Sequence, residues 1–269
     1  MPAAPIERDP AAVQTPAGSP PRITPDAEPS LRAAIRCLVA EAFGTFALVY
    51  VACAAVFTSE LTSAVGVAFG LVVAAMIFAI GPISGAHINP AVSFGFALHG
   101  SFAWRLLPGY VLAQCVGGFF GVLALAATFP HLTAYEIGDG GTFPALGDAP
   151  GAHRAAFVAE VLHTLVLMLV ILRVAFNAKG EGLKAGLAIG ATVGCLALGG
   201  GAAGASMNPA RSVFFDLYSG RTDATWIYLV GPLVGAALAV ALNRVISPRG
   251  DLRDLRDLRD TGNAADAAD

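Results

Sequence analysis

This sequence has few charged residues. Only 13% of its 269 residues are charged, whereas 56% are hydrophobic; soluble domains carry about 25% charged residues. Between Cys37 and Leu98 the only charged residues are Glu41 and Glu60. A soluble helix or strand does not stay apolar for that long, whereas each helix that crosses a bilayer needs about 20 apolar residues. The scarcity of charge therefore argues against a soluble protein and predicts an integral membrane protein.

The signatures of several other protein classes are also missing. The net charge of −3 is too small to favour nucleic acid as a partner. The four cysteines form no CxxC pair and no Cys/His cluster, which argues against a metal site or a disulfide framework. No nucleophile–base pair is recognisable, so we expect neither enzyme activity nor a cofactor. The first 30 residues hold eight prolines and no apolar core, unlike a signal peptide.

What is present is a series of apolar segments in the central part of the chain. Six are long, at about 33–57, 61–80, 104–128, 154–175, 183–200 and 224–246. Two more, at about 89–98 and 208–217, are too short to cross a bilayer, and each begins with Asn-Pro-Ala. This pattern predicts an all-α membrane protein in which six transmembrane helices and two re-entrant half-helices occupy residues 31–247.

The two ends of the chain differ from this central domain. Residues 1–30 are rich in proline and are expected to be a disordered tail. Residues 248–269 form a charged tail whose DLRDLRDLRD repeat would be a solvated helix or disordered. With six spans, thirteen basic residues lie on the side of both tails, against Arg154 and Arg221 on the other. The positive-inside rule then predicts cytoplasmic termini for a multi-pass protein of the cell membrane.

The central domain contains an internal repeat. Glu41 lies 48 residues before Asn89, and Glu160 lies 48 residues before Asn208. Because each copy holds three spans, the copies must cross the membrane in opposite directions, which places a functional site near the midplane. The copies occupy about 31–128 and 154–247.

The repeated Asn-Pro-Ala tripeptides predict helix starts. Asparagine is a strong N-cap residue and proline is favoured at the first helical position, so helices should begin at Asn89 and Asn208. Two half-helices that enter from opposite faces would point the positive ends of their dipoles at the centre. There, two side-chain amides could donate hydrogen bonds to an uncharged solute, while the dipoles repel cations. The two motifs comprise Asn89, Pro90, Ala91, Asn208, Pro209 and Ala210.

The sequences around these motifs, SGAHINPAVS and GASMNPARS, are similar to the two signature loops of the aquaporin, or major intrinsic protein, family. The similarity covers about residues 31–247. It implies a homotetramer of six-helix bundles in the lipid bilayer, each with its own pore for water and small neutral solutes. It also implies that Asn89 and Asn208 are the central donors of that pore and that half-helix dipoles and an arginine exclude ions.

The same resemblance implies a selectivity filter of four residues. Arg211 matches the filter arginine of the family, and Phe69 and Ala205 match two further positions. Counting back from the second Asn gives Leu196 as the fourth residue, whereas counting along the helix gives Ala197. Neither is a histidine, so the filter should be wider and more apolar than that of strict water channels. Glycerol, urea or metalloid hydroxides would then pass with water. On physical grounds alone, the arginine could instead be paired or reach toward the lipid surface.

Three ionisable residues support this interpretation. Glu41 and Glu160 are costly in apolar segments, and the resemblance implies that they brace the Asn-Pro-Ala loops. The alternative is an acid at a helix end near the membrane surface. His87 matches a family histidine at the cytoplasmic pore mouth, where it could be a fixed hydrogen-bonding group or a proton switch.

Some positions point to a branch of the family. Ser212 matches the residue type that follows the filter arginine in water channels. The Tyr228-Leu229 pair and Asp216 match the residue types of neither water nor glycerol channels. Together they resemble the plant nodulin-like branch and its bacterial relatives, which conduct mixed small solutes.

An ion-coupled secondary transporter is the main alternative function, because inverted repeats and broken helices occur there too. Coupling would need an ionisable relay in mid-membrane, yet the spans offer little beyond Glu41, Glu160 and Arg211. A purely structural or adhesion role is a minor alternative. The sequence therefore predicts a passive channel.

Overall fold

A computed structural model of the chain describes residues 30–59, 61–147, 149–177 and 182–247. The tails expected at 1–30 and 248–269 lie outside these residues, apart from Ser30.

The chain folds entirely into helices over the described residues. The first half contains α1 (Leu31–Ala47), the π-helical turn η1 (Leu48–Ala52), α2 (Cys53–Thr58), α3 (Thr62–Ser84), α4 (Pro90–His99), η2 (Trp104–Leu106) and α5 (Leu107–Thr128). The second half contains α7 (Ala152–Asn177), α8 (Gly182–Leu198), α9 (Pro209–Ser219) and α10 (Thr225–Ile246). A short helix, α6 (Ala134–Gly138), lies in the connection between the halves.

Among the described residues, five helical segments are long and apolar enough to cross a membrane. They are Leu31–Thr58, Ser63–Ser84, Trp104–Thr128, Ala152–Ala175 and Thr225–Ile246. The sixth expected span corresponds to α8, which has only 17 residues. It ends just before the run Gly199–Gly201, and three successive glycines are poor helix formers. The expected all-α membrane fold is confirmed, with one span shorter than the other five.

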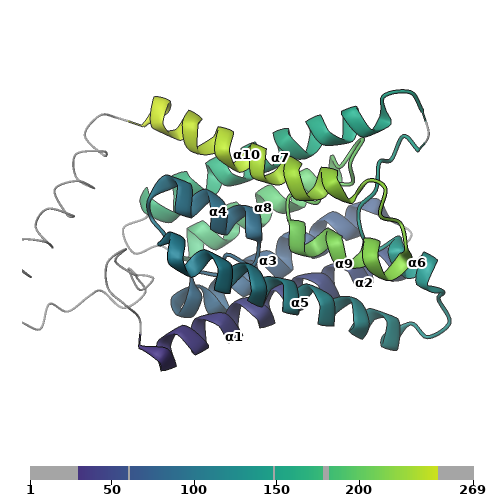
Figure 1. Cartoon of the computed structure of the whole chain (residues 1–269), viewed down its shortest axis with the longest axis horizontal. Coiled ribbons are helices and arrows are strands. Elements are labelled where there is room, and N and C mark those ends of the chain that lie inside the picture. The colour runs from purple at the N-terminus through teal and green to yellow at the C-terminus, as the bar shows by residue number, and fades with distance from the viewer. Residues whose placement is uncertain (1–29, 60, 148, 178–181, 248–269) are drawn as a thin grey trace, which may run out of the picture.

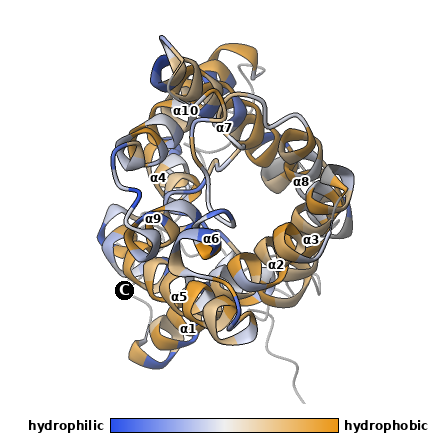
Figure 2. Cartoon of the chain, turned by 90° about the vertical axis from the view of Figure 1, so that its right-hand side faces the viewer, coloured by the Kyte–Doolittle hydropathy of each residue, from blue (hydrophilic) through white to orange (hydrophobic). Residues whose placement is uncertain are grey.

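The two half-helices lie inside the bundle and face each other. In Figure 1, α4 and α9 lie on opposite sides of the centre, between the long helices. We call the side where α1 begins and α10 ends the terminal face, and the side that carries α6 the loop face. Figure 2 views the molecule from the loop face, with hydrophobic residues on the outside of the helices. These outward side chains, such as Phe43, Leu71 and Leu112, are exposed as a lipid-facing surface requires.

The inverted repeat is visible in the packing. Helix α1 packs on α5 as α7 packs on α10, and α3 packs on α8 across the two halves. Gly70 and Gly190 lie at the α3–α8 crossing. A Cβ atom on Gly70 would lie 2.7 Å from the carbonyl oxygen of Gly190, and one on Gly190 would lie 2.5 Å from that of Gly70. Gly70 ends the segment GVAFG at 66–70, and Gly190 ends its equivalent GLAIG at 186–190, so equivalent residues touch at this crossing.

Helix α6 was not expected from the sequence. It begins with a capping box in which Thr133 N donates to Glu136 Oε2 at 2.7 Å and Glu136 N donates to Thr133 Oγ1 at 3.3 Å. The hydrogen bonds from Thr133 lower the pKa of the exposed Glu136 carboxyl. Farther along the same connection, Ala145 N donates to Ala202 O at 2.9 Å. The connection is thereby attached to the loop that precedes α9.

Candidate functional site: the central pore

Both half-helices begin where the sequence predicts. Asn89 caps α4 by accepting a 2.8 Å hydrogen bond from Ala91 N through Oδ1, and Asn208 caps α9 by accepting one of 3.1 Å from Ala210 N. The proline after each asparagine occupies the start of the helix. The predicted helix starts at Asn89 and Asn208 are therefore confirmed.

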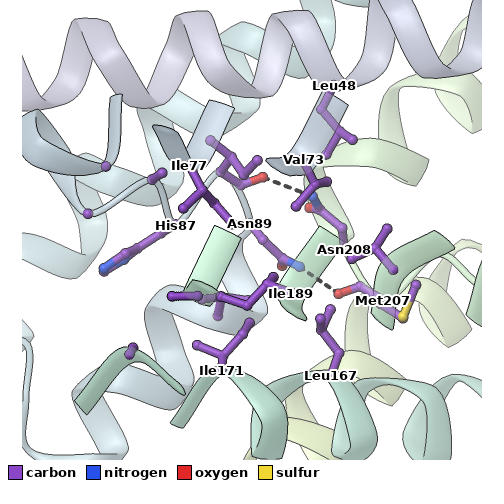
Figure 3. A pocket seen from close by; sticks show the side chains of 18 of the residues that line it. Leu48, Val73, Ile77, His87, Asn89, Leu167, Ile171, Ile189, Met207 and Asn208 are labelled. Atoms are coloured by element: carbon purple, nitrogen blue, oxygen red, sulfur yellow. Dashed lines mark hydrogen bonds between the residues drawn. The ribbon is translucent and has the colours of Figure 1, made fainter. Parts of the chain in front are cut away.

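The two asparagine side chains also join the two halves of the protein. Asn89 Nδ2 donates to Met207 O at 2.7 Å, and Asn208 Nδ2 donates to Ile88 O at 2.9 Å (Figure 3). An amide group carries two N–H donors, so each asparagine retains one for a solute. The sequence did not indicate that one N–H of each asparagine is used to hold the two loops together.

The loops that lead into the half-helices have an unusual backbone. Ala86, Ile88, Ala205 and Met207 are non-glycine residues with φ between 42° and 55°. This left-handed conformation costs about 1–3 kcal/mol per residue unless the surroundings impose it. The four residues form two equivalent pairs, 119 positions apart, so both copies of the repeat adopt the same strained loop.

Glu41 imposes this conformation on the first loop. Its Oε1 accepts hydrogen bonds from His87 N at 2.9 Å and Ser84 Oγ at 2.7 Å. Its Oε2 accepts from Ile88 N at 2.6 Å and Gln114 Nε2 at 2.8 Å. Glu41 is fully buried, which fits a bracing group and does not fit an acid at the membrane surface.

Glu160 holds the second loop with fewer partners. It accepts hydrogen bonds from Ser206 N at 2.7 Å and Met207 N at 2.8 Å, and it is also fully buried. Within the described residues no side chain donates a hydrogen bond to this carboxylate. The two copies therefore share the main-chain contacts but differ in the side chains around them.

Gln114 links the first brace to the half-helix. Its Nε2 also lies 2.9 Å from Ser93 Oγ, and Ser93 Oγ is 3.0 Å from His87 Nδ1. The His87 ring packs against Phe102 and Tyr110, with ring centroids 4.9 Å and 5.1 Å away. These contacts hold His87 in place, which favours the fixed hydrogen-bonding group over a proton switch. The sequence alone does not reveal the role of Gln114, because its partners lie in two other segments of the chain, α1 and α4.

A cavity of about 430 Å³ surrounds the asparagine pair. It extends from Phe78 and Ala175 toward the terminal face to Phe69 and Arg211 toward the loop face. Most of its lining is apolar. The polar side chains in the lining are those of His87, Asn89, Ser206, Asn208 and Arg211.

Three of the expected filter residues, Phe69, Ala205 and Arg211, line this cavity. Along α8 the lining residues follow the spacing of one helix face and include Ala197. Among the described lining residues Leu196 does not appear; it is partly buried against the hydrophobic core. The helical register therefore favours Ala197 over Leu196 as the fourth residue. Counting back from Asn208 points to Leu196 because the loop between them is one residue shorter than its equivalent.

Arg211 is buried in the cavity wall, with 5% of its surface exposed. The carbon of its guanidinium group lies 4.7 Å from the centre of the Phe69 ring. Its Nε and Nη1 atoms have no hydrogen-bond partner among the described residues. Arg211 is thus neither at the lipid surface nor fully paired, and it forms part of the cavity wall.

The branch-typical residues lie around this site. Asp216 is almost fully buried, and its Oδ2 accepts a 2.6 Å hydrogen bond from Thr225 Oγ1. It lines a separate pocket of about 260 Å³ near the loop face, together with Asp223 and Arg221. Ser212 is fully buried in α9. In the described part of the chain no group of three or more His, Cys, Asp or Glu residues is placed to hold a metal.

Comparisons with known proteins agree with this geometry. The family model described as "Major intrinsic protein" matches residues 29–242. Aquaporin NIP1-1 of Zea mays is 40% identical over 227 residues, which cover 81% of this chain and 78% of the relative. Nodulin-26 of Glycine max is 37% identical over 217 residues, with 78% and 77% covered. The crystal structure of the aquaglyceroporin from Plasmodium falciparum superposes with a TM-score of 0.72 at 28% identity, covering 81% of this chain and 99% of that chain.

The family match spans most of the chain and includes both Asn-Pro-Ala half-helices, their glutamates and the arginine that follows the second motif. The chain is a multi-pass membrane protein that belongs to the major intrinsic protein family, the aquaporins, and within it to the NIP, or nodulin-26-like, branch.

Proposed function

We propose that this protein is a passive channel for water and small uncharged solutes that excludes ions and protons. The observation that carries the proposal is the meeting of two half-helix N-termini, each with one free Asn N–H, inside a largely apolar cavity. A neutral solute can accept these hydrogen bonds in place of those it loses to water.

Exclusion of cations follows from the charges around the cavity. The positive ends of α4 and α9 both point to its middle. Toward the loop face, the buried guanidinium group of Arg211 adds a full positive charge. In a low-dielectric setting these charges repel cations strongly, whereas a neutral solute is unaffected.

The proposed filter consists of Phe69, Ala197, Ala205 and Arg211. Two of its four side chains are methyl groups, which leave more room than a histidine or a larger residue would. We therefore propose that glycerol, urea and small metalloid hydroxides such as boric acid pass with water. A solved relative that is named an aquaglyceroporin supports this class of solutes by analogy.

The carboxylate environments argue against an ion-coupled transporter. Coupling requires a carboxylate that binds and releases an ion or proton during transport. Glu41 and Glu160 instead accept main-chain hydrogen bonds that maintain the loops. Release of either carboxylate would remove the hydrogen bonds that hold the loop before the half-helix.

We further propose that the protein forms a homotetramer in the cell membrane with the terminal face in the cytoplasm. The continuous apolar exterior supports burial in lipid and against neighbouring subunits. The thirteen basic residues assigned to the terminal side support this orientation.

The proposal can be tested with the full chain in proteoliposomes. Glycerol, urea and boric acid uptake would be measured by light scattering, with and without an imposed proton gradient. We expect uptake above that of empty vesicles and no response to the gradient. Uptake that requires the gradient would mean that the protein is a coupled transporter.

A further inference from the structure

The inverted repeat gives every filter residue an equivalent in the other half of the protein. Within α3 and α8 the equivalents lie 120 positions apart, and in the loops and half-helices they lie 119 positions apart. The equivalents of Phe69, Ala197, Ala205 and Arg211 are therefore Ile189, Ile77, Ala86 and Val92. All four of these equivalents line the central cavity. We call Ile77, Ala86, Val92 and Ile189 the inner ring.

The repeat holds in three dimensions as well as in sequence. The α3–α8 crossing joins two equivalent glycines, and each asparagine donates to the carbonyl group just before the other. A two-fold axis that relates the two halves therefore places the equivalents of the filter residues on the opposite side of the asparagine pair. In Figure 3, Ile77 and Ile189 lie on either side of Asn89. The inner ring is thus the counterpart of the filter on the side of the terminal face.

The chemistry of the two groups differs most at one position. The filter has the charged guanidinium group of Arg211 in its wall, whereas the inner ring has the apolar Val92 at the equivalent place. His87 also lines the cavity; its Nδ1 is used with Ser93, which leaves one ring nitrogen, Nε2, for a solute. A solute with several hydroxyl or amide groups must give up water there with fewer replacement hydrogen bonds.

At one position the inner ring is bulkier than the filter, because Ile77 stands at the position equivalent to Ala197. Ile189, the equivalent of Phe69, adds a second branched side chain to the cavity wall. A single file of water needs little width and few hydrogen bonds. A solute of glycerol size needs more of both.

We propose that the inner ring is a second selectivity barrier, in series with the filter, which discriminates against polar solutes larger than water. This inference rests on the proposed channel function. Because permeation through two barriers in series is limited by the higher one, widening the filter alone would leave the inner ring to restrict larger solutes.

The test compares glycerol and water permeability of full-length variants in proteoliposomes. In the double variant Ile77→Ala/Ile189→Ala we expect glycerol permeability to rise by about threefold or more, while water permeability changes by less than about twofold. The matched control is Leu71→Ala/Leu187→Ala, on the same two helices, because Leu71 and Leu187 are 65% and 54% exposed on the outer surface. The control should conduct like the wild type.

Glycerol permeability that stays at the wild-type level in a double variant that still conducts water would overturn the proposal. If that variant does not fold, Val92→Thr replaces it, since threonine keeps the shape of valine and adds a hydroxyl group. We expect Val92→Thr to raise glycerol permeability too, and no increase would equally overturn the proposal. Failure of the channel function itself is distinguishable, because the wild-type protein would then conduct no water.

Discussion

The side-chain amide of Asn89 donates a 2.7 Å hydrogen bond to the main-chain carbonyl of Met207, which lies in the opposite half of the chain. In the equivalent contact, the side-chain amide of Asn208 donates a 2.9 Å hydrogen bond to the main-chain carbonyl of Ile88. The two residues that are placed to bind solute therefore also fix the position of each half-helix relative to the other. Alignment of the pore and its chemistry depend on the same two side chains.

This relationship predicts the effect of Asn89→Asp. Aspartate has nearly the same shape but no N–H donor, so the contact with Met207 is lost and a negative charge appears at the centre of the pore. We expect lower water permeability and a measurable cation leak, assayed with an ion-sensitive dye in vesicles. Asn208→Asp should behave alike, because its contact is equivalent. Intact cation exclusion in both variants would contradict this role.

The register of the filter can be decided with two substitutions on adjacent residues of α8. Ala197→Leu adds bulk to the cavity wall and should lower glycerol permeability by roughly fivefold. Leu196→Ala removes bulk from a side chain outside the lining and should leave glycerol permeability unchanged. An effect of Leu196→Ala without any effect of Ala197→Leu would show that Leu196, and not Ala197, is the fourth filter residue.

Removal of the filter arginine should relax selectivity. Arg211→Ala takes away a buried charge, its unpartnered donors and its contact with Phe69 at 4.7 Å. We expect weaker exclusion of cations, measured with an ion-sensitive dye, and faster passage of those neutral solutes that the inner ring admits, measured as swelling rates across a series of polyols. Arg154→Ala is the control, since Arg154 is exposed at the start of α7. Equal selectivity in the two variants would remove Arg211 from the filter.

The bracing glutamates predict a loss of stability on neutralisation. Glu160→Gln replaces one carboxylate oxygen with an NH₂ group that faces a main-chain N–H. Loss of a charge-assisted hydrogen bond inside the protein should destabilise it by about 2 kcal/mol. Thermal unfolding in detergent would report the change, with Asp223→Asn as an exposed control. A melting temperature equal to that of the control would show that Glu160 does not hold the loop.

The α3–α8 crossing predicts a second stability effect. Gly70→Ala would place a methyl group 2.7 Å from the Gly190 carbonyl oxygen, so the helices must separate. We expect a loss of about 1–3 kcal/mol in the free energy of unfolding. Gly81→Ala on the same helix is the matched control, because the nearest atom would be 3.9 Å away. Equal stability of the two variants would mean that the crossing is looser than the structure indicates.

Much of this fold is predictable from periodicity and capping alone. Long apolar runs determine the spans to within a few residues, because a bilayer leaves few alternatives to a helix. The half-helix starts at Asn89 and Asn208 follow from local capping chemistry, which needs no knowledge of the rest of the fold. The bracing role of Glu41 and Glu160 was implied by the family resemblance, and their equal spacing from the two asparagines agrees with it.

Features that depend on distant partners were not predictable. The contacts of Gln114 with Glu41 and Ser93 join three helices. The hydrogen bond between Thr142 and Ser212 attaches the connection between α5 and α7 to α9. No local sequence pattern predicts this contact. The fourth filter residue was ambiguous for a related reason. A one-residue deletion shifts loop-based counting, whereas only the helix itself reveals which side of α8 faces the cavity.

In the function proposed for this protein, water and small neutral solutes pass through the cavity while protons do not. The most direct test is stopped-flow osmotic shrinkage of proteoliposomes that contain the full chain and a pH-sensitive dye. We expect water permeability well above that of empty vesicles, with no faster decay of an imposed pH gradient. Water permeability equal to that of empty vesicles, or a pH gradient that collapses with the water flow, would contradict it.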